Sequence, residues 1–79
     1  MINHWRAKFY LEDIMEAQKL SVDKIVEISG LEKTWIINYL SDSEIIIDKA
    51  RDAILCEATN QEKGYFYNLD QIWLKNKNL

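Results

Sequence analysis

Hydrophobic residues recur every three or four positions along most of the chain, which predicts helices rather than strands. The first such stretch covers about residues 3–19, where Ala7, Leu11 and Ile14 share one face. Proline is absent and glycine occurs only at positions 30 and 64, so long helices are favoured and flexible linkers are not expected. The pattern therefore indicates an all-α chain.

Two short helices are expected to meet at a sharp bend in the middle of the chain. Ser21 is a good N-cap for the first of them, and Gly30 suits the left-handed position that ends it. Its apolar residues, expected to face inward, are Ile25, Val26 and Ile28. The second helix is predicted over about residues 32–40, with Ile36, Tyr39 and Leu40 buried.

Two further helices are predicted in the second half of the chain. Ser41 and Glu44 fit a capping box that opens one of them, and this helix should end before Gly64. Its apolar stripe is expected to consist of Ile46, Ile47, Ala50, Ala53 and Ile54. Ile45, Leu55 and Cys56 fall off this stripe and either meet the aromatic residues near the C-terminus or form an interface. Asn68 and Gln71 repeat the capping-box pattern and predict a last helix after an extended run at residues 65–67.

The length and composition indicate a single domain over residues 1–79. A core this small often needs support from a disulfide, a metal or a second subunit. The chain has one cysteine, Cys56, and one histidine, His4, so an internal disulfide is excluded and a metal site or another cofactor is not expected. A homodimer is the expected support. With no apolar signal core and no run long enough to cross a membrane, the sequence predicts a cytoplasmic protein.

The charge and the reactive side chains limit the function classes. The formal net charge is −3, whereas nucleic-acid binders usually carry an excess of basic residues. DNA binding would therefore need a local basic patch or a favourable dimer geometry. Cys56 has no base placed near it by the sequence, and no paired carboxylates or glycine-rich phosphate loop are present, so an enzyme is not expected.

The segment from Leu20 to Leu40 resembles the helix-turn-helix of the phage repressor and Cro-type (XRE-like) family. The residues that carry the resemblance are Leu20-Ser21 at the helix entry, Ile25 and Val26 at the helix crossing, Gly30-Leu31 at the turn and Ile36 in the recognition helix. Ala7, Leu11 and Ile14 before this segment, and residues 68–72 after it, also match in order. The resemblance implies a five-helix lambda-repressor-like DNA-binding domain with its helix-turn-helix at about residues 21–40. It also implies a small transcription regulator of phage or mobile-element origin.

The same resemblance implies a DNA interface on the third helix. Lys33, Thr34 and Asn38 would contact base edges in double-stranded DNA. The implied phosphate contacts are Ser21, Ser41 and Ser43. A two-fold homodimer of this kind meets half-sites about 34 Å apart.

A protein-interaction module on the same scaffold, such as an antirepressor or accessory regulator, is the alternative hypothesis. Residues 32–48 contain one lysine and four acidic residues, which disfavours contact with phosphate. Trp35 and Ile37 flank the third helix and would form a docking face for another protein. Trp35 is expected either to be exposed for this role or to pack against the first helix.

Overall fold

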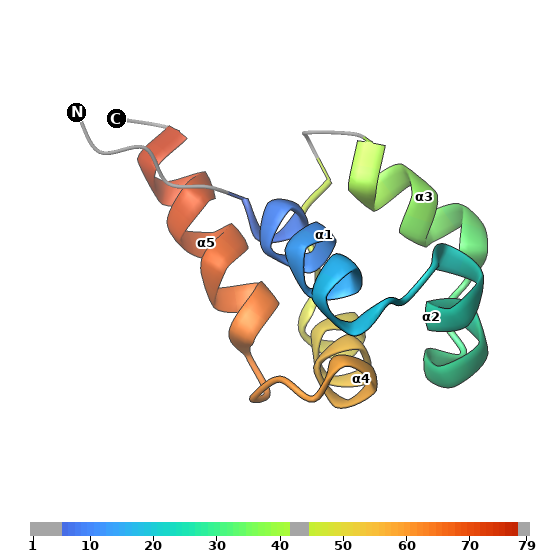
Figure 1. Ribbon diagram of the computed structural model, residues 1–79. Coiled ribbons are helices and arrows are strands. Elements are labelled where there is room, and N and C mark those ends of the chain that lie inside the picture. Colours follow the sequence, from blue (N-terminus) through green and yellow to red (C-terminus); the bar gives the residue numbers. More distant parts are fainter. Residues whose placement is uncertain (1–5, 42–44, 78–79) are drawn as a thin grey trace.

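The computed structural model describes residues 6–41 and 45–77 (Figure 1). These residues form five helices: α1 (Ala7–Gln18), α2 (Val22–Ser29), α3 (Lys33–Ser41), α4 (Lys49–Thr59) and α5 (Tyr65–Lys77). The described residues contain no strand, so the predictions of an all-α chain and of five helices are confirmed. Within this part of the chain, every helix is too short or too polar to cross a membrane.

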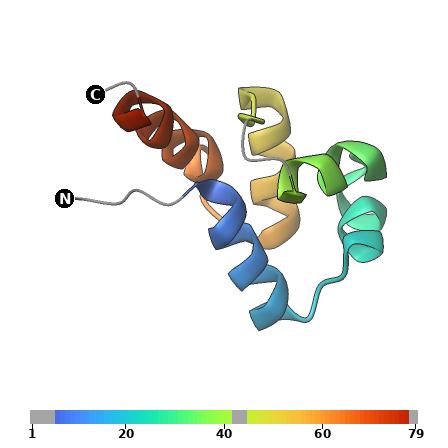
Figure 2. The same cartoon turned by 90° about the horizontal axis from the view of Figure 1, so that it is seen from above.

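The helices are arranged along an elongated body. The α2–α3 pair and α5 lie at opposite ends, with α1 and α4 between them (Figures 1 and 2). The molecule measures 38 × 21 × 21 Å. α1 contacts α3 and α5, α4 contacts α2 and α5, and α2 contacts α3. The buried apolar side chains between them are Ala7, Leu11, Ile25, Leu31, Ile36, Tyr39, Ile47, Leu55, Cys56 and Phe66.

The bend at Gly30 is confirmed and has a local cause. Ser21 caps α2, since its Oγ accepts a hydrogen bond of 3.1 Å from the backbone N–H of Lys24. Gly30 ends the helix at φ +76°, a left-handed conformation that glycine adopts without strain. Ile25 is fully buried, but Ile28 is 46% exposed, so the prediction that it faces inward is wrong.

α4 begins later than the sequence predicts. Ser41 is the last residue of α3, and its hydroxyl donates to the carbonyl of Ile37 at 2.8 Å instead of capping a new helix. Glu44, its partner in the predicted capping box, lies outside the described residues. Asp48 is the actual N-cap, with Oδ1 accepting from the backbone N–H of Arg51 at 2.7 Å. Residues 45–47 are not helical, which agrees with the low helix propensity of three successive isoleucines.

The later start also changes which face of α4 is buried. Leu55 and Cys56 lie in the core with Phe66 of α5, so the first of the two expected alternatives, contact with the C-terminal aromatics, is the one observed. Ile54, expected on the buried stripe, is 40% exposed, Ala50 is exposed as well, and that part of the prediction is wrong.

α5 begins earlier than predicted because a carboxylate from α4 caps it. Asp52 is buried, with one oxygen accepting from the N–H of Gly64 at 2.7 Å and the other from the N–H of Tyr67 at 2.8 Å. These are N–H groups at a helix start that lack partners within the helix. The aromatic run at residues 65–67 is therefore helical rather than extended, and Asn68 lies inside α5 rather than at its cap.

A second buried carboxylate, Asp70, joins four segments of the chain. Its Oδ1 accepts from the N–H of Ala7 at the start of α1, at 3.0 Å. Its Oδ2 accepts from the hydroxyl of Tyr39 on α3 at 2.7 Å and from the N–H of Ile47 before α4 at 3.0 Å. Because Asp70 itself belongs to α5, one side chain positions α1, α3 and the approach to α4 against α5.

A buried arginine accompanies this carboxylate. Arg6 is 2% exposed, and its guanidinium nitrogen lies 3.8 Å from Oδ2 of Asp70. The same guanidinium lies over the rings of Trp73, at 5.0 Å, and Tyr39, at 5.6 Å. Burial, followed by the charge of Asp70, raises the pKa of the Tyr39 hydroxyl well above its usual range.

Candidate nucleic-acid interface

α3 presents one uncovered face to solvent (Figure 1). Its inner residues, Ile36 and Tyr39, are fully buried. Its exposed residues are Lys33, Thr34, Ile37, Asn38 and Ser41. These positions follow the spacing of one helix face, three or four residues apart, so they form a continuous stripe. The stripe is polar at its edges and carries one aliphatic side chain, Ile37, which is 45% exposed.

The three side chains predicted to contact bases all lie on the surface of α3. Thr34 and Asn38 are exposed and lie one turn apart. Lys33 is the first residue of the helix, and its ammonium group lies 2.8 Å from a carboxylate oxygen of Asp23 on α2. The structure therefore brings these residues together on the surface of one helix, while their contact with DNA stays a prediction.

The serines predicted to contact phosphate have separate environments. Ser21 is exposed, and its Oγ accepts a hydrogen bond as the N-cap of α2. Ser41 is exposed at the other end of the two-helix segment and donates to a carbonyl of its own helix. Ser43 lies outside the described residues. A phosphate contact by Ser41 would therefore replace an existing hydrogen bond.

The two predicted partner contacts differ in accessibility. Trp35 is half-buried and stacks on Tyr39, with ring centroids 5.0 Å apart and planes 9° apart. The guanidinium of Arg51 on α4 lies 5.1 Å above the Trp35 ring. Trp35 therefore links α3 to α4, and Ile37 is the more accessible of the two apolar side chains. Cation–π contacts of this kind contribute about 0.5–1 kcal/mol at exposed sites.

The basic side chains on the described surface around α3 lie beside acids. Lys24 pairs with Glu27 at 3.6 Å, and Arg51 pairs with Asp48 at 2.5 Å. The backbone N–H of Arg51 is the main cause that lowers the pKa of Asp48. These pairs are substantially exposed, and such pairs contribute only about 0–1 kcal/mol. A phosphate group can therefore compete with the acids for the same cations.

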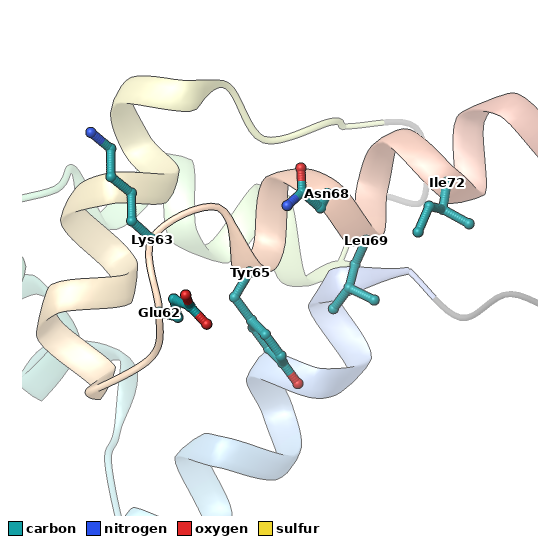
Figure 3. A pocket seen from close by; sticks show the side chains of 6 residues that line it. All are labelled: Glu62, Lys63, Tyr65, Asn68, Leu69 and Ile72. Atoms are coloured by element: carbon teal, nitrogen blue, oxygen red, sulfur yellow. The ribbon is translucent and has the colours of Figure 1, made fainter.

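Among the described residues, two hollows lie outside the α3 face, and the sequence pattern predicts neither of them. One, of about 380 Å³, follows α5 and is lined by Glu62, Lys63, Tyr65, Asn68, Leu69 and Ile72 (Figure 3). The other, of about 470 Å³, lies between α2 and α4 and is lined by Ile28, Ser29, Ile54, Glu57 and Ala58. The sequence signal for the second hollow is weak, because Ile28 and Ile54 fit the helical periodicity of core residues.

In the described part of the chain, few side chains could bind a metal ion or act as a nucleophile. There, no three histidine, cysteine, aspartate or glutamate side chains come together in a way that would hold a metal ion. Cys56 is buried, with its sulfur 3.4 Å from Oδ1 of Asp52, and burial raises the pKa of this thiol. A raised pKa lowers the fraction of thiolate, which is the nucleophilic form.

A scan against protein-family models and searches among curated proteins and solved structures return no match for this chain. Its function is therefore inferred from the exposed face of α3, the charges around it and the two hollows.

Proposed function

We propose that this chain is a small transcription regulator of the phage repressor and Cro type (XRE-like), which binds operator DNA through α3 as a homodimer. In this proposal the chain is a five-helix lambda-repressor-like domain, with α2, the bend at Gly30 and α3 as its helix-turn-helix. The observation that carries the proposal is the uncovered face of α3, while the opposite face is held in the core. A helix presented in this way fits the major groove of B-DNA, which is about 12 Å wide.

Four exposed side chains of α3 can each contact a base edge. Asn38 offers a bidentate pair for adenine, and Lys33 can donate to guanine. Thr34 can form a hydrogen bond or contact the methyl group of thymine, and Ile37 offers a larger apolar surface for the same methyl group. A site read by these residues would be rich in A·T pairs.

Phosphate contacts would come from α2 and the basic residues near α3. Ser21 begins α2, where unpaired N–H groups and the helix dipole favour an anion. The candidate cations are Lys24, Lys33 and Arg51. If all three neutralise phosphates, a plot of the logarithm of the binding constant against the logarithm of the salt concentration should have a slope of about −2.7 per copy.

A salt series tests this proposal directly. The full chain is titrated into fluorescently labelled duplex DNA of mixed sequence, and anisotropy is measured at increasing salt. We expect binding at low salt that weakens steeply as salt rises. An absence of binding at the lowest salt contradicts DNA binding by the isolated chain.

Matched asparagine variants then test the role of α3. Binding sites are first selected from a random duplex pool with the wild-type chain. Asn38→Ala should lower affinity for the selected site by about 1–3 kcal/mol, because a bidentate base contact is lost. Asn60→Gly removes an exposed asparagine between α4 and α5 instead, at a left-handed position that glycine adopts without strain, and should leave affinity unchanged. Equal effects of the two variants contradict recognition through α3.

The homodimer in this proposal is assigned to the surface shared by α1 and α5. The hollow along α5 contains apolar side chains, with Tyr65 and Leu69 projecting on the side that faces α1 (Figure 3). Tyr10 of α1 meets Tyr65 edge-on at 6.4 Å between centroids, and Ile72 is 44% exposed. Ile72→Asp should shift the chain towards monomer in sedimentation equilibrium, and an unchanged mass contradicts this assignment.

A protein-interaction module is the second candidate, and the pairing of the surface cations with acids favours it. In this alternative, Ile37 and the exposed part of Trp35 meet another protein. Ile37→Ser is the better test, since Trp35 also supports the packing between α3 and α4. If the chain fails to bind DNA at any salt concentration, this alternative becomes the leading hypothesis.

A further inference from the structure

The hollow between α2 and α4 has a mixed lining and contains two isoleucine side chains that the rest of the described chain leaves exposed. Ile28 is 46% exposed and Ile54 is 40% exposed, and both line it together with Ala58. The remaining lining residues are Ser29 and Glu57. Its volume of about 470 Å³ is large enough to receive a bulky side chain.

The charge around this hollow is negative for two independent reasons. Glu57 contributes an exposed carboxylate to its wall. The hollow also lies where α2 and α4 end, and a helix C-terminus carries a partial negative charge. Neither helix has a basic residue in its last turn to offset that charge. The hollow therefore repels phosphate and favours a cationic occupant.

We propose that this hollow docks an apolar, basic segment of another protein. A bulky aliphatic or aromatic side chain of that segment lies between Ile28 and Ile54. A neighbouring lysine or arginine lies beside Glu57 and the two helix ends. None of the lining residues belongs to the α3 face proposed to contact DNA, so a DNA-bound copy keeps this surface available for a protein partner.

A second copy of the chain is a poorer occupant than a different protein. The end of α5 carries Ile72 and Lys75, which are apolar and basic. However, contact between α5 of one copy and the α2–α4 hollow of another joins two different surfaces. Such a contact produces rings or open chains instead of the two-fold dimer that the proposed function needs.

A designed peptide pair tests the docking directly. The probe is a labelled amphipathic peptide of roughly 14 residues, long enough to form a helix, with leucine at one face and lysine elsewhere. The control peptide has glutamate in place of every lysine. We expect the lysine peptide to bind and to shift the NMR amide signals of Ser29 and Ala58, while the glutamate peptide does not bind.

Matched variants of the chain separate docking from general charge attraction. Ile54→Ser should weaken binding of the lysine peptide on the order of ten-fold, whereas Ile37→Ser alters an isoleucine of similar exposure on α3, outside the hollow and outside the proposed dimer surface, and should not. Glu57→Lys should weaken binding by a similar factor, and Glu12→Lys makes the same charge change on α1 as its control. All four positions are exposed, so the variants are expected to fold, and far-ultraviolet circular dichroism checks this.

Three results would overturn the proposal. One is equal binding of the two peptides, and another is an equal effect of each variant and its control. The third is self-association of the chain that Ile54→Ser abolishes in the absence of peptide, because the hollow would then receive a second copy. The peptide assay contains no DNA, so its outcome is independent of the proposed regulator function.

Discussion

Replacing Asp70 by asparagine tests whether one buried carboxylate holds the ends of the fold together. Asp70 is fully buried and accepts hydrogen bonds from the N–H groups of Ala7 and Ile47 and from the hydroxyl of Tyr39. Asparagine has the same shape but only one oxygen. In either orientation of the amide, its NH₂ group faces a backbone N–H, so Ala7 or Ile47 loses its acceptor.

The expected loss of stability follows from these contacts. A lost hydrogen bond to a charged group lowers the free energy of unfolding by about 1.5–3 kcal/mol. The substitution also removes the negative charge beside the buried guanidinium of Arg6, and breaking a buried ion pair costs about 3–5 kcal/mol. The two effects overlap, so we expect a total loss of about 3–5 kcal/mol. Small domains have only about 5–15 kcal/mol in all, so much of the variant should unfold under mild conditions.

Urea denaturation at neutral pH measures this effect. Unfolding is followed by far-ultraviolet circular dichroism and by tryptophan fluorescence for the wild type, Asp70→Asn and Asp13→Asn. Asp13 is an exposed carboxylate on α1, so its variant makes the same charge change outside the core and should alter stability by no more than about 0.5 kcal/mol. The double variant Arg6→Met/Asp70→Asn should lose less free energy of unfolding than the losses of the two single variants added together, because it leaves no unpaired buried charge.

The reasoning fails if Asp70→Asn unfolds at the same urea concentration as Asp13→Asn. It also fails if the loss of stability in the double variant equals the sum of the losses in Arg6→Met and Asp70→Asn, since the two charges would then act independently.

Three further predictions concern other points of the fold. Asp52→Asn should lower the free energy of unfolding by about 1.5–3 kcal/mol and speed hydrogen exchange of the Gly64 or the Tyr67 amide, because asparagine keeps one acceptor oxygen for these two N–H groups. Gly30→Ala should lower the free energy of unfolding by about 1–2 kcal/mol in thermal melts, through the left-handed backbone alone, because no atom lies within 4 Å of the added Cβ. The raised pKa of Tyr39 means that the folded state favours the neutral phenol. This preference stabilises the folded state fully below pH 10.0, the ordinary pKa of tyrosine, and the stabilisation is lost as the pH rises through the raised pKa. Tyr39→Phe should therefore show a shallower loss of stability than the wild type between about pH 9 and 11 in urea titrations.

The bend between α2 and α3 is predictable from the sequence because its causes are local. The N-cap, Ser21, and the C-cap, Gly30, both lie within one residue of the helix that they limit. The hydroxyl of Ser21 and the left-handed backbone of Gly30 act on the nearest backbone groups, so no knowledge of the rest of the fold is needed.

The start of α5 and the non-helical segment before α4 depend on distant residues, which explains why the sequence misplaces the two helices. The N–H groups at the start of α5 are satisfied by Asp52, twelve and fifteen residues earlier in the chain. The N–H of Ile47 is satisfied by Asp70, which lies 23 residues later. Aspartate is mostly exposed in folded proteins, so a sequence pattern gives no reason to place either carboxylate in the core.

On α3 too, the exposure of some side chains has a local cause and that of others depends on distant residues. The exposure of Thr34 and Asn38 follows from the helical periodicity of α3, and the sequence predicts it. The different accessibility of Trp35 and Ile37 depends on Arg51, which arrives from α4 and lies over one of them. Periodicity within a short helix does not contain that information.

The two faces of α3 should therefore respond to different measurements. Tyr39→Phe removes a hydrogen bond to a buried carboxylate and should lower the free energy of unfolding by about 1.5–3 kcal/mol. Per folded molecule, it should leave DNA affinity unchanged, because the outer face is intact. Asn38→Ala should change stability by no more than about 0.5 kcal/mol while it weakens DNA binding. If Asn38→Ala lowers stability as much as Tyr39→Phe, the outer face of α3 is part of the structural core and both proposals for its function lose their basis.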